Sequence, residues 1–258
     1  MLAKKESMMY KYLVVLFILF AAQANAAESH LFILSGQSNM GPKQAASGFE
    51  NAIQLRFPDD EITVVHGAKG GMPISTWGEG GFMWGPNTFK RALTNTLEEN
   101  AGRNYDTVTF VWMQGEADTK SDEQTETYEV KLVELYDRVK EYAGITEMYW
   151  VISRLNDANV PGGEADLKEV FQLDNWETIR EIQVETAEAR DYAAWVDWDD
   201  LNGPLNTIHL AAADGSSTRQ DSERYPELAE RWANAAADLI QGITPDEEED
   251  APTVGNEQ

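Results

Sequence analysis

The segment LFILSGQSNM, residues 31–40, places a serine directly after an apolar run. Ser38 lies between Gln37 and Asn39 in the polar stretch where that run ends. A serine oxygen can attack an ester carbonyl when a nearby base, usually histidine, takes its proton. Ser38 is therefore a candidate nucleophile, with Gln37 and Asn39 as candidate supporting residues. A serine in a glycine-containing turn is, on its own, more often a helix cap, so this hypothesis requires further groups.

Ester hydrolysis also needs hydrogen-bond donors for the oxyanion of the tetrahedral intermediate, and losing one donor costs roughly 3–4 kcal/mol. Gly71, in GGMPISTW, can bring a bare backbone N–H close to a ligand because it has no side chain. Gln114, in QGEAD, carries a side-chain amide. With the N–H of Ser38 these groups form a candidate oxyanion hole, and Glu116 is expected to orient the site or a loop. The plain alternatives are a glycine turn and a polar strand end.

The chain contains three histidines, so the candidate base can be chosen by elimination. His30 precedes the first apolar run and falls at the wrong end of it. His66 lies inside a second strand-like run and is expected to be a packed side chain. His209 follows the last strand-like run in a loop before a long helical segment. If the protein has a catalytic base, it is His209.

Strand-like and helix-like segments alternate between residues 31 and 243. Several of the expected strands are continuous apolar or β-branched runs, which is typical of strands covered on both faces. The five expected strands are 31–35, 61–67, 106–115, 147–155 and 193–198. The expected helices carry apolar stripes, or follow a proline or a serine cap: a helix just after Ser38, then 87–100, 121–144, 174–190 and 223–240.

This alternation predicts an α/β fold with about five parallel strands and helices on both faces of the sheet. Ligands of such sheets bind beyond the carboxyl ends of the strands. Ser38 and Gly71 follow the first two expected strands, Gln114 lies at the end of the third, and His209 follows the last. The fold would therefore bring these four residues to the same edge of the sheet.

The three blocks GQSNM, GGMPISTW and QGEAD resemble the first three conserved blocks of the SGNH/GDSL hydrolase superfamily. More narrowly, they resemble its sialate O-acetylesterase and acetylxylan esterase branch, carbohydrate esterase family six. The resemblance covers residues 31 to about 240. It implies a three-layer α/β/α flavodoxin-like fold and cofactor-free, metal-free removal of acetyl groups from carbohydrates. It also implies Ser38 as nucleophile and an oxyanion hole of Ser38, Gly71 and Gln114.

The fourth block departs from the family pattern. The family ends in Asp-x-x-His, in which the aspartate orients the imidazole, whereas this chain has Asn206-Thr207-Ile208-His209. Three interpretations are open. Another carboxylate, such as Asp199, Asp200 or Asp214, serves His209; or a Ser–His pair works with Asn206; or the site is degraded and only binds. In the serine-protease triad, the equivalent change lowers turnover about ten-thousandfold.

Three functions follow from these observations. The leading one is a carbohydrate O-acetylesterase that forms a serine acyl-enzyme. A lipase-like or thioester hydrolase of the same superfamily would need an extended apolar channel, and the polar, tryptophan-containing loop at 76–87 argues against one. A catalytically impaired carbohydrate-binding relative is the non-enzyme alternative, and Asn206 is the residue that favours it.

Other residues carry two interpretations each. Trp77, Phe82 and Trp84, in the loop after the second block, could stack on a sugar or pack in the interior. Arg154 and Asn156, at the end of the fourth strand, could reach a polar substrate, or Arg154 could form a surface salt bridge.

Composition and the chain ends restrict location and partners. Residues 1–26 combine a basic start, an apolar run and Ala24-Asn25-Ala26, which predicts a cleaved signal peptide and a periplasmic or secreted protein; a retained anchor is the alternative. Residues 244–258 are acidic and predicted to be disordered. The formal charge of −25 disfavours nucleic acid and anionic membrane surfaces as partners. The chain has no cysteine and no histidine pair at metal-ligand spacing.

Overall fold

The computed structural model describes residues 27–157, 172–201, 209–210 and 224–243. The expected signal peptide and acidic tail lie outside these residues, as do Asn206 and Asp214. In the part of the chain that the structure describes, no helix has the length and apolar character needed to cross a bilayer.

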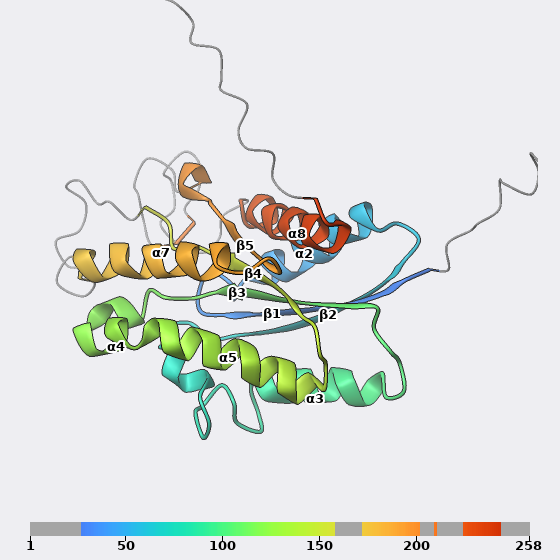
Figure 1. Cartoon of the computed structure of the whole chain (residues 1–258), viewed down its shortest axis with the longest axis horizontal. Coiled ribbons are helices and arrows are strands. Elements are labelled where there is room, and N and C mark those ends of the chain that lie inside the picture. The colour runs from blue at the N-terminus through green and yellow to red at the C-terminus, as the bar shows by residue number, and fades with distance from the viewer. Residues whose placement is uncertain (1–26, 158–171, 202–208, 211–223, 244–258) are drawn as a thin grey trace, which may run out of the picture.

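Five parallel strands form one sheet, which confirms the predicted α/β fold (Figure 1). The spatial order is β2-β1-β3-β4-β5. The strands are β1 (Ser29–Gly36), β2 (Glu61–Ala68), β3 (Thr107–Met113), β4 (Tyr149–Ser153) and β5 (Ala193–Val196). The chain moves from β1 to β2 on one side and then places β3 on the other side of β1. The carboxyl ends of β1 and β3 are therefore a topological switch point, where sheets of this type bind ligands.

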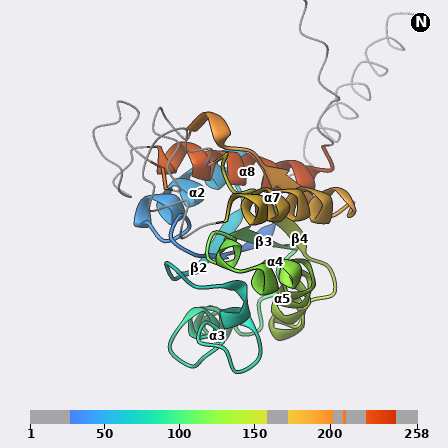
Figure 2. The same cartoon turned by 90° about the vertical axis from the view of Figure 1, so that its left-hand side faces the viewer.

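Helices cover both faces of the sheet (Figures 1 and 2). On one face lie α2 (Lys43–Arg56) and α8 (Tyr225–Gln241), which pack against each other. On the other lie α3 (Phe89–Glu99), α5 (Tyr128–Ala143) and α7 (Leu173–Glu188). Short helical turns connect these layers: η1 (Ile74–Trp77), η2 (Asp118–Lys120), α4 (Asp122–Glu126) and η3 (Asp199–Leu201).

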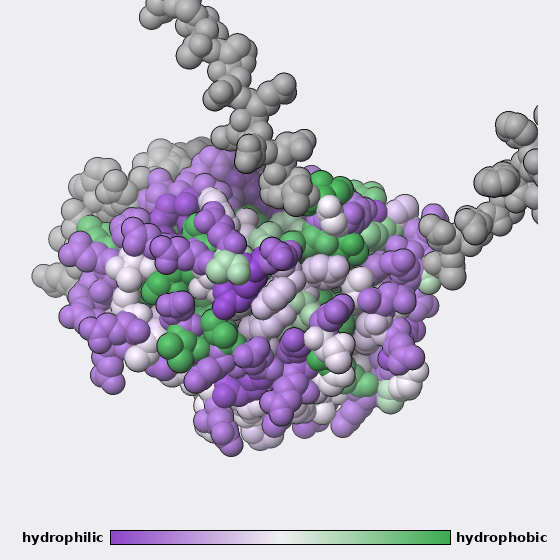
Figure 3. Space-filling view, in the orientation of Figure 1, coloured by the Kyte–Doolittle hydropathy of each residue, from purple (hydrophilic) through white to green (hydrophobic). Residues whose placement is uncertain are grey.

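Successive residues of the central strand serve opposite layers. Leu31 and Ile33 pack in the apolar cluster beneath α3, α5 and α7, whereas Phe32 and Leu34 pack in the cluster beneath α2 and α8. All four are at most 1% exposed. Because neighbouring side chains point to opposite faces, a strand covered on both faces needs a continuous apolar run. The outer surface drawn in Figure 3 is mostly hydrophilic.

Two expected helices differ from the structure. The helix expected over 121–144 is interrupted at Thr127, whose hydroxyl donates to the carbonyls of Glu123 (2.9 Å) and Gln124 (3.2 Å) and whose backbone leaves the helical conformation. The helix after Ser38 begins only at Lys43, with Pro42 as its N-cap residue. Ser38 therefore lies in the turn between β1 and α2, and the helix-cap interpretation of Ser38 is wrong.

Gly36, at the end of β1, is required by a close backbone approach. A Cβ atom at this position would lie 1.9 Å from the carbonyl oxygen of Met113 on β3. The next residue, Gln37, donates its N–H to the same oxygen at 3.0 Å. A side chain at position 36 would therefore push apart the strand ends that carry the first and third blocks.

We expect Gly36→Ala to lower the free energy of unfolding by about 3 kcal/mol, the upper end of typical overpacking costs. For a domain of this size that corresponds to a fall of roughly 9 °C in Tm, measurable by thermal denaturation. The matched control is Gly102→Ala, where φ is +90° but no atom lies within 4 Å. There only the backbone strain of about 1 kcal/mol applies. Equal Tm losses in the two variants would contradict the close-approach argument.

Candidate active site

The first two blocks lie against each other at the carboxyl ends of β1 and β2. Ser38 is half-buried two residues after β1. A Cβ atom built on Gly70 would lie 3.6 Å from the Cβ of Ser38. Gly71 is exposed, has a φ of +72° and has open space where a side chain would be. The main chain at Gly71 is therefore open to a ligand.

Two glutamine side chains join the third block to the first. The Nε2 of Gln114 donates to the Oε1 of Gln37 at 3.2 Å, and the backbone N–H of Ala117 donates to the same oxygen at 3.2 Å. The Nε2 of Gln37 donates to the Oγ of Ser38 at 3.4 Å. Gln37 and Gln114 are 3% and 0% exposed. Both side chains are therefore buried, and Gln37 connects Gln114 to Ser38.

Two side chains from neighbouring helices bind the backbone just after β3. The main-chain carbonyl of Gln114 accepts hydrogen bonds from the Tyr128 hydroxyl and from the Nε2 of Gln183, both at 2.7 Å. These donors come from α5 and α7. The backbone that carries Gln114 is therefore fixed by two helices of the same layer.

Asn39 and Glu116 link the neighbour of Ser38 to the other helix layer. The Nδ2 of Asn39 donates to the Oε1 of Glu116 at 2.8 Å, and the Tyr225 hydroxyl of α8 donates to the Oδ1 of Asn39 at 3.1 Å. All the atoms concerned are buried. The contact gives Glu116 a partner beside Ser38, as its expected orienting role requires, and its effect on turnover stays a prediction.

Burial raises the pKa of Glu116 from 4.5 to about 7, against the opposing effect of hydrogen bonds that include the one from Asn39. A raised folded-state pKa means that the folded protein holds this proton more tightly than the unfolded chain. The free energy of unfolding therefore falls as pH rises from about 4.5 to 7, by about 3 kcal/mol in total.

Glu116→Gln is expected to remove this loss, because an amide keeps an oxygen for Asn39 and carries no charge. The Tm of the variant should exceed that of the wild type at pH 8, and the difference should shrink towards pH 4.5. Thermal denaturation across this pH range measures it, with Glu123→Gln on the exposed face of α4 as control. Parallel pH profiles for wild type and Glu116→Gln would contradict the assignment.

The structure separates the three histidines. His30 is fully buried at the start of β1, away from the carboxyl ends, with its Nδ1 2.7 Å from the Oγ1 of Thr107. The Nε2 of His66 lies 2.7 Å from the carbonyl oxygen of Met40, so this nitrogen donates. His30 therefore lies at the opposite end of the sheet from Ser38, whereas the choice of His209 over His66 as base stays a prediction.

His209 is half-buried, and this burial lowers the pKa of its imidazole. The ring is therefore neutral at pH 7, which is the form that can accept a proton. The next residue, Leu210, is fully buried in the apolar cluster that also contains Met40 and Tyr225. The chain at His209 thus enters the same helix-covered layer as the turn that carries Ser38.

Asp199, a candidate partner for His209, is held by arginines. Its Oδ2 accepts from Arg154 (2.6 Å) and Arg180 (2.9 Å), and its Oδ1 accepts from Arg180 (3.0 Å) and from the N–H of Asp157 (2.7 Å). Both oxygens are thus occupied. The ion-pair interpretation of Arg154 is confirmed, because it also contacts Asp197 at 2.8 Å.

Asp200 is likewise bound elsewhere, by both terminal nitrogens of Arg231 at 2.6 and 2.7 Å. Its side chain is 66% exposed. The other two groups proposed to orient the imidazole, Asn206 and Asp214, lie outside the described residues. The structure therefore disfavours Asp199 and Asp200 for that role.

The aromatic loop divides into packed and exposed rings. Trp77 is fully buried and donates from its Nε1 to the Oγ of Ser35 at 2.9 Å. Trp84 packs against Phe89 and Tyr142. Phe82 is 55% exposed. Of the three aromatic residues considered as a sugar-stacking wall, Phe82 is the most exposed and Trp84 is half-buried.

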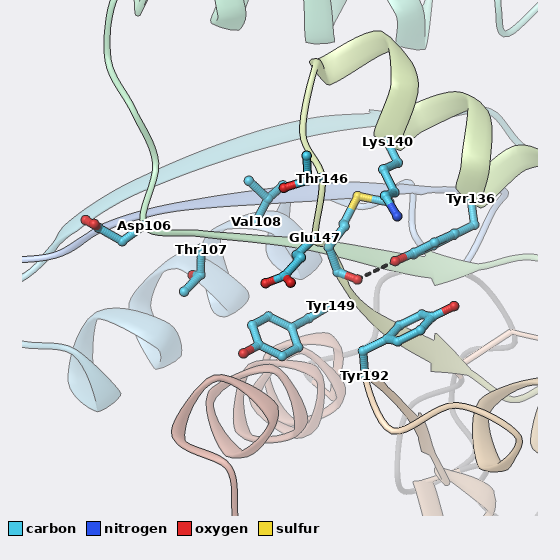
Figure 4. Close-up of a pocket in the computed structure, with 10 residues that line it drawn as sticks. Asp106, Thr107, Val108, Tyr136, Lys140, Thr146, Glu147, Tyr149 and Tyr192 are labelled. Carbon is cyan, nitrogen blue, oxygen red and sulfur yellow. Dashed lines mark hydrogen bonds between the residues drawn. The ribbon is translucent and has the colours of Figure 1, made fainter.

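A separate pocket of about 330 Å³ opens at the other end of the sheet (Figure 4). It is formed where β3 and β4 begin, and α5 and the loop before β5 complete it. Its wall includes tyrosines and charged side chains: Asp106, Tyr136, Lys140, Glu147, Tyr149 and Tyr192. Because it lies at the amino ends of the strands, it is distinct from the Ser38 site.

Comparison with known proteins shows the family of this chain. The family described as carbohydrate esterase, sialic acid-specific acetylesterase, matches residues 41–227, a span that includes Gly71, Gln114 and His209 and begins just after Ser38. No curated protein matches the sequence.

Two solved structures share the fold. A protein from Arabidopsis thaliana is 18% identical with a TM-score of 0.55, covering 84% of this chain and 100% of its own. A carbohydrate acetylesterase from Xanthomonas citri is 16% identical with a TM-score of 0.55; the alignment covers 83% of this chain and 57% of that one. The family profile spans most of the chain, and the sheet has the expected topology. The chain therefore belongs to the carbohydrate esterase family of sialic acid-specific acetylesterases.

Proposed function

We propose that this protein is a periplasmic or secreted carbohydrate O-acetylesterase whose nucleophile is Ser38. The observation that carries the proposal is the convergence of three sequence blocks around Ser38. Gly70 lies against its side chain, and Gln37 donates to its oxygen while accepting from Gln114. The membership of an acetylesterase family supports the same reaction.

In the proposed reaction the Oγ of Ser38 attacks the acetyl carbonyl carbon while His209 takes the hydroxyl proton. The carbonyl oxygen becomes an oxyanion, stabilised by the N–H groups of Ser38 and Gly71 and by the amide of Gln114. As the C–O bond to the sugar breaks, His209 returns its proton to the departing sugar oxygen. A water molecule, deprotonated by His209, then attacks the acyl carbon; acetate leaves as His209 returns the proton to the Oγ of Ser38.

The imidazole needs a group that fixes its orientation. Asp199 and Asp200 are bound by arginines, so the proposal leaves Asn206 and Asp214. Asn206 occupies the place of the family's aspartate but cannot carry a negative charge. A Ser–His pair assisted by Asn206 would therefore stabilise the imidazolium less than an aspartate does.

The substrate class proposed is an acetylated carbohydrate outside the cytoplasm, either a polysaccharide such as xylan or an O-acetylated sialic acid. The acetyl group is small, so no extended acyl channel is needed. Phe82, with its exposed ring after the second block, is the aromatic residue proposed to contact sugar. Comparing acetate release from these glycans identifies which of them is the substrate.

The test is acetate release by the full chain from p-nitrophenyl acetate, acetylated xylan and an O-acetylated sialic acid, each beside Ser38→Ala. We expect release by the wild type that the variant lacks. Hydrolysis that increases from acetate to octanoate p-nitrophenyl esters would instead indicate a lipase-like or thioester hydrolase. Glycan binding with no ester turnover and no labelling of Ser38 by a fluorophosphonate would indicate the catalytically impaired relative.

A further inference from the structure

Asp118 is a buried carboxylate that the proposed mechanism leaves without a role. It lies at the start of η2, four residues after Gln114, and is fully buried. Its Oδ2 accepts from the Nε2 of Gln114 at 2.6 Å and from the backbone N–H of Ile74 at 2.9 Å. Asp118 therefore ties the third block to the segment that follows Gly71.

The carboxylate decides which end of the Gln114 amide faces this segment. An ionised carboxylate only accepts hydrogen bonds, so it requires the NH₂ group of Gln114 on its side. The Nε2 of Gln114 also lies 3.1 Å from the carbonyl oxygen of Met72 and 3.2 Å from the Oε1 of Gln37. Two hydrogens thus face three acceptors, and the short, charge-assisted contact with Asp118 holds one of them.

The second hydrogen of Gln114 is shared between two weaker, neutral acceptors. A negatively charged oxyanion forms stronger hydrogen bonds than a neutral carbonyl does. An oxyanion formed on the Ser38 side can therefore compete with Met72 and Gln37 for this hydrogen. The contact with Asp118 remains in place meanwhile and keeps the amide from rotating.

The orientation of Gln114 also fixes that of Gln37, whose side chain contacts Ser38. Because the Oε1 of Gln37 accepts from Gln114 and from the N–H of Ala117, its NH₂ group is turned towards the Oγ of Ser38. A hydroxyl that accepts at its oxygen keeps its own hydrogen for another partner. In the proposed reaction that partner is the base.

We propose that Asp118 is a positioning residue, which fixes the amides of Gln114 and Gln37 so that their donors serve the oxyanion and the nucleophile. The proposal rests on the proposed function, since it assigns Asp118 a part in that reaction. Asp118 does not itself touch substrate, and it acts through Gln114.

Burial supports a functional rather than a stabilising role. It raises the pKa of Asp118 from 3.8 to about 6, although Gln114, the N–H of Ile74 and the charge of Lys131 all favour the ionised form. The other titratable groups that interact with Asp118 are Glu116, on the same segment, and Tyr128 of α5. A carboxylate with a raised pKa destabilises the folded protein once it is ionised, so its amide isostere should not lower stability.

The test is Asp118→Asn, assayed at pH 8 with p-nitrophenyl acetate. In Asp118→Asn the N–H of Ile74 keeps the side-chain oxygen in place, but that oxygen is neutral and holds the amide of Gln114 less tightly than a carboxylate does. We expect kcat to fall about tenfold, less than the loss caused by removing a whole oxyanion donor, with KM changed less than twofold and Tm equal or higher. The rate of Ser38 labelling by a fluorophosphonate should fall in proportion. Asp122→Asn, on exposed α4, is the control and should match the wild type.

A double-variant cycle tests whether Asp118 acts through Gln114. In the Gln114→Ala background, Asp118→Asn should lower kcat by less than threefold further, because its effect has already been removed. Unchanged kcat in Asp118→Asn, additive losses in the cycle, or a lowered Tm would each overturn the proposal. If the wild type hydrolyses none of the esters, the proposed function itself has failed, which is a distinguishable result.

Discussion

Ser38→Ala is expected to lower kcat for p-nitrophenyl acetate by about 10⁶-fold, the scale of removing a nucleophile from a serine hydrolase. Without the oxygen no acyl-enzyme can form, and the oxyanion donors alone leave only a small residual rate. The fold should be retained, since Ser38 is a half-buried residue in a turn and the apolar layers on both faces are untouched.

Steady-state kinetics and thermal denaturation measure the two parts of this prediction. Ser47→Ala is the control, because Ser47 is exposed on α2 and its hydroxyl donates to the Lys43 carbonyl of the same helix. Its kcat should equal that of the wild type. Turnover retained in Ser38→Ala within tenfold would exclude Ser38 as the nucleophile.

His209→Ala is expected to lower kcat by about 10⁵-fold, because His209 is the group that takes the proton from Ser38 in the proposed mechanism. In the wild type, burial lowers the pKa of His209. The imidazole is therefore neutral down to a pH below its ordinary pKa, and kcat/KM should fall only as the pH drops through that lowered value. The loss on the acid side arises because the protonated ring cannot accept the serine proton.

Imidazole added to His209→Ala should restore part of the lost rate, since the vacated space can hold a free base. The control is His66→Gln, which removes the ring that donates to the Met40 carbonyl; its kcat should fall at most tenfold. A larger loss in His66→Gln than in His209→Ala would show that the base had been assigned to the wrong histidine.

The strands and the fold class were predictable because their signals are local. Each strand that is covered on both faces must alternate its side chains between two apolar layers, as Leu31 and Phe32 do. This produces a continuous apolar run that can be read along the sequence. The predicted strand 61–67 and the observed Glu61–Ala68 differ by one residue. Helix ends were less certain: the hydroxyl of Thr127 competes for backbone carbonyls, which splits one predicted helix into two.

The sequence also predicted the candidate site residues: a serine, a glycine and a glutamine at the ends of successive strands, and one histidine left by elimination. It could not determine what each acidic residue does. QGEAD contains two carboxylates of similar appearance, yet Glu116 is bound by Asn39 and Asp118 by Gln114 and Ile74. Both are buried, and burial raises the pKa of each.

Only the tertiary structure decided these assignments, because partners come from segments far apart in the chain. Asn39 and Glu116 are 77 positions apart and meet because β1 and β3 are neighbours in the sheet. Asp199 is likewise bound by Arg154, 45 positions away, at the ends of β4 and β5. Backbone periodicity is encoded by residues two to four positions apart, whereas the burial and charge state of a carboxylate depend on whichever elements the sheet order places beside it.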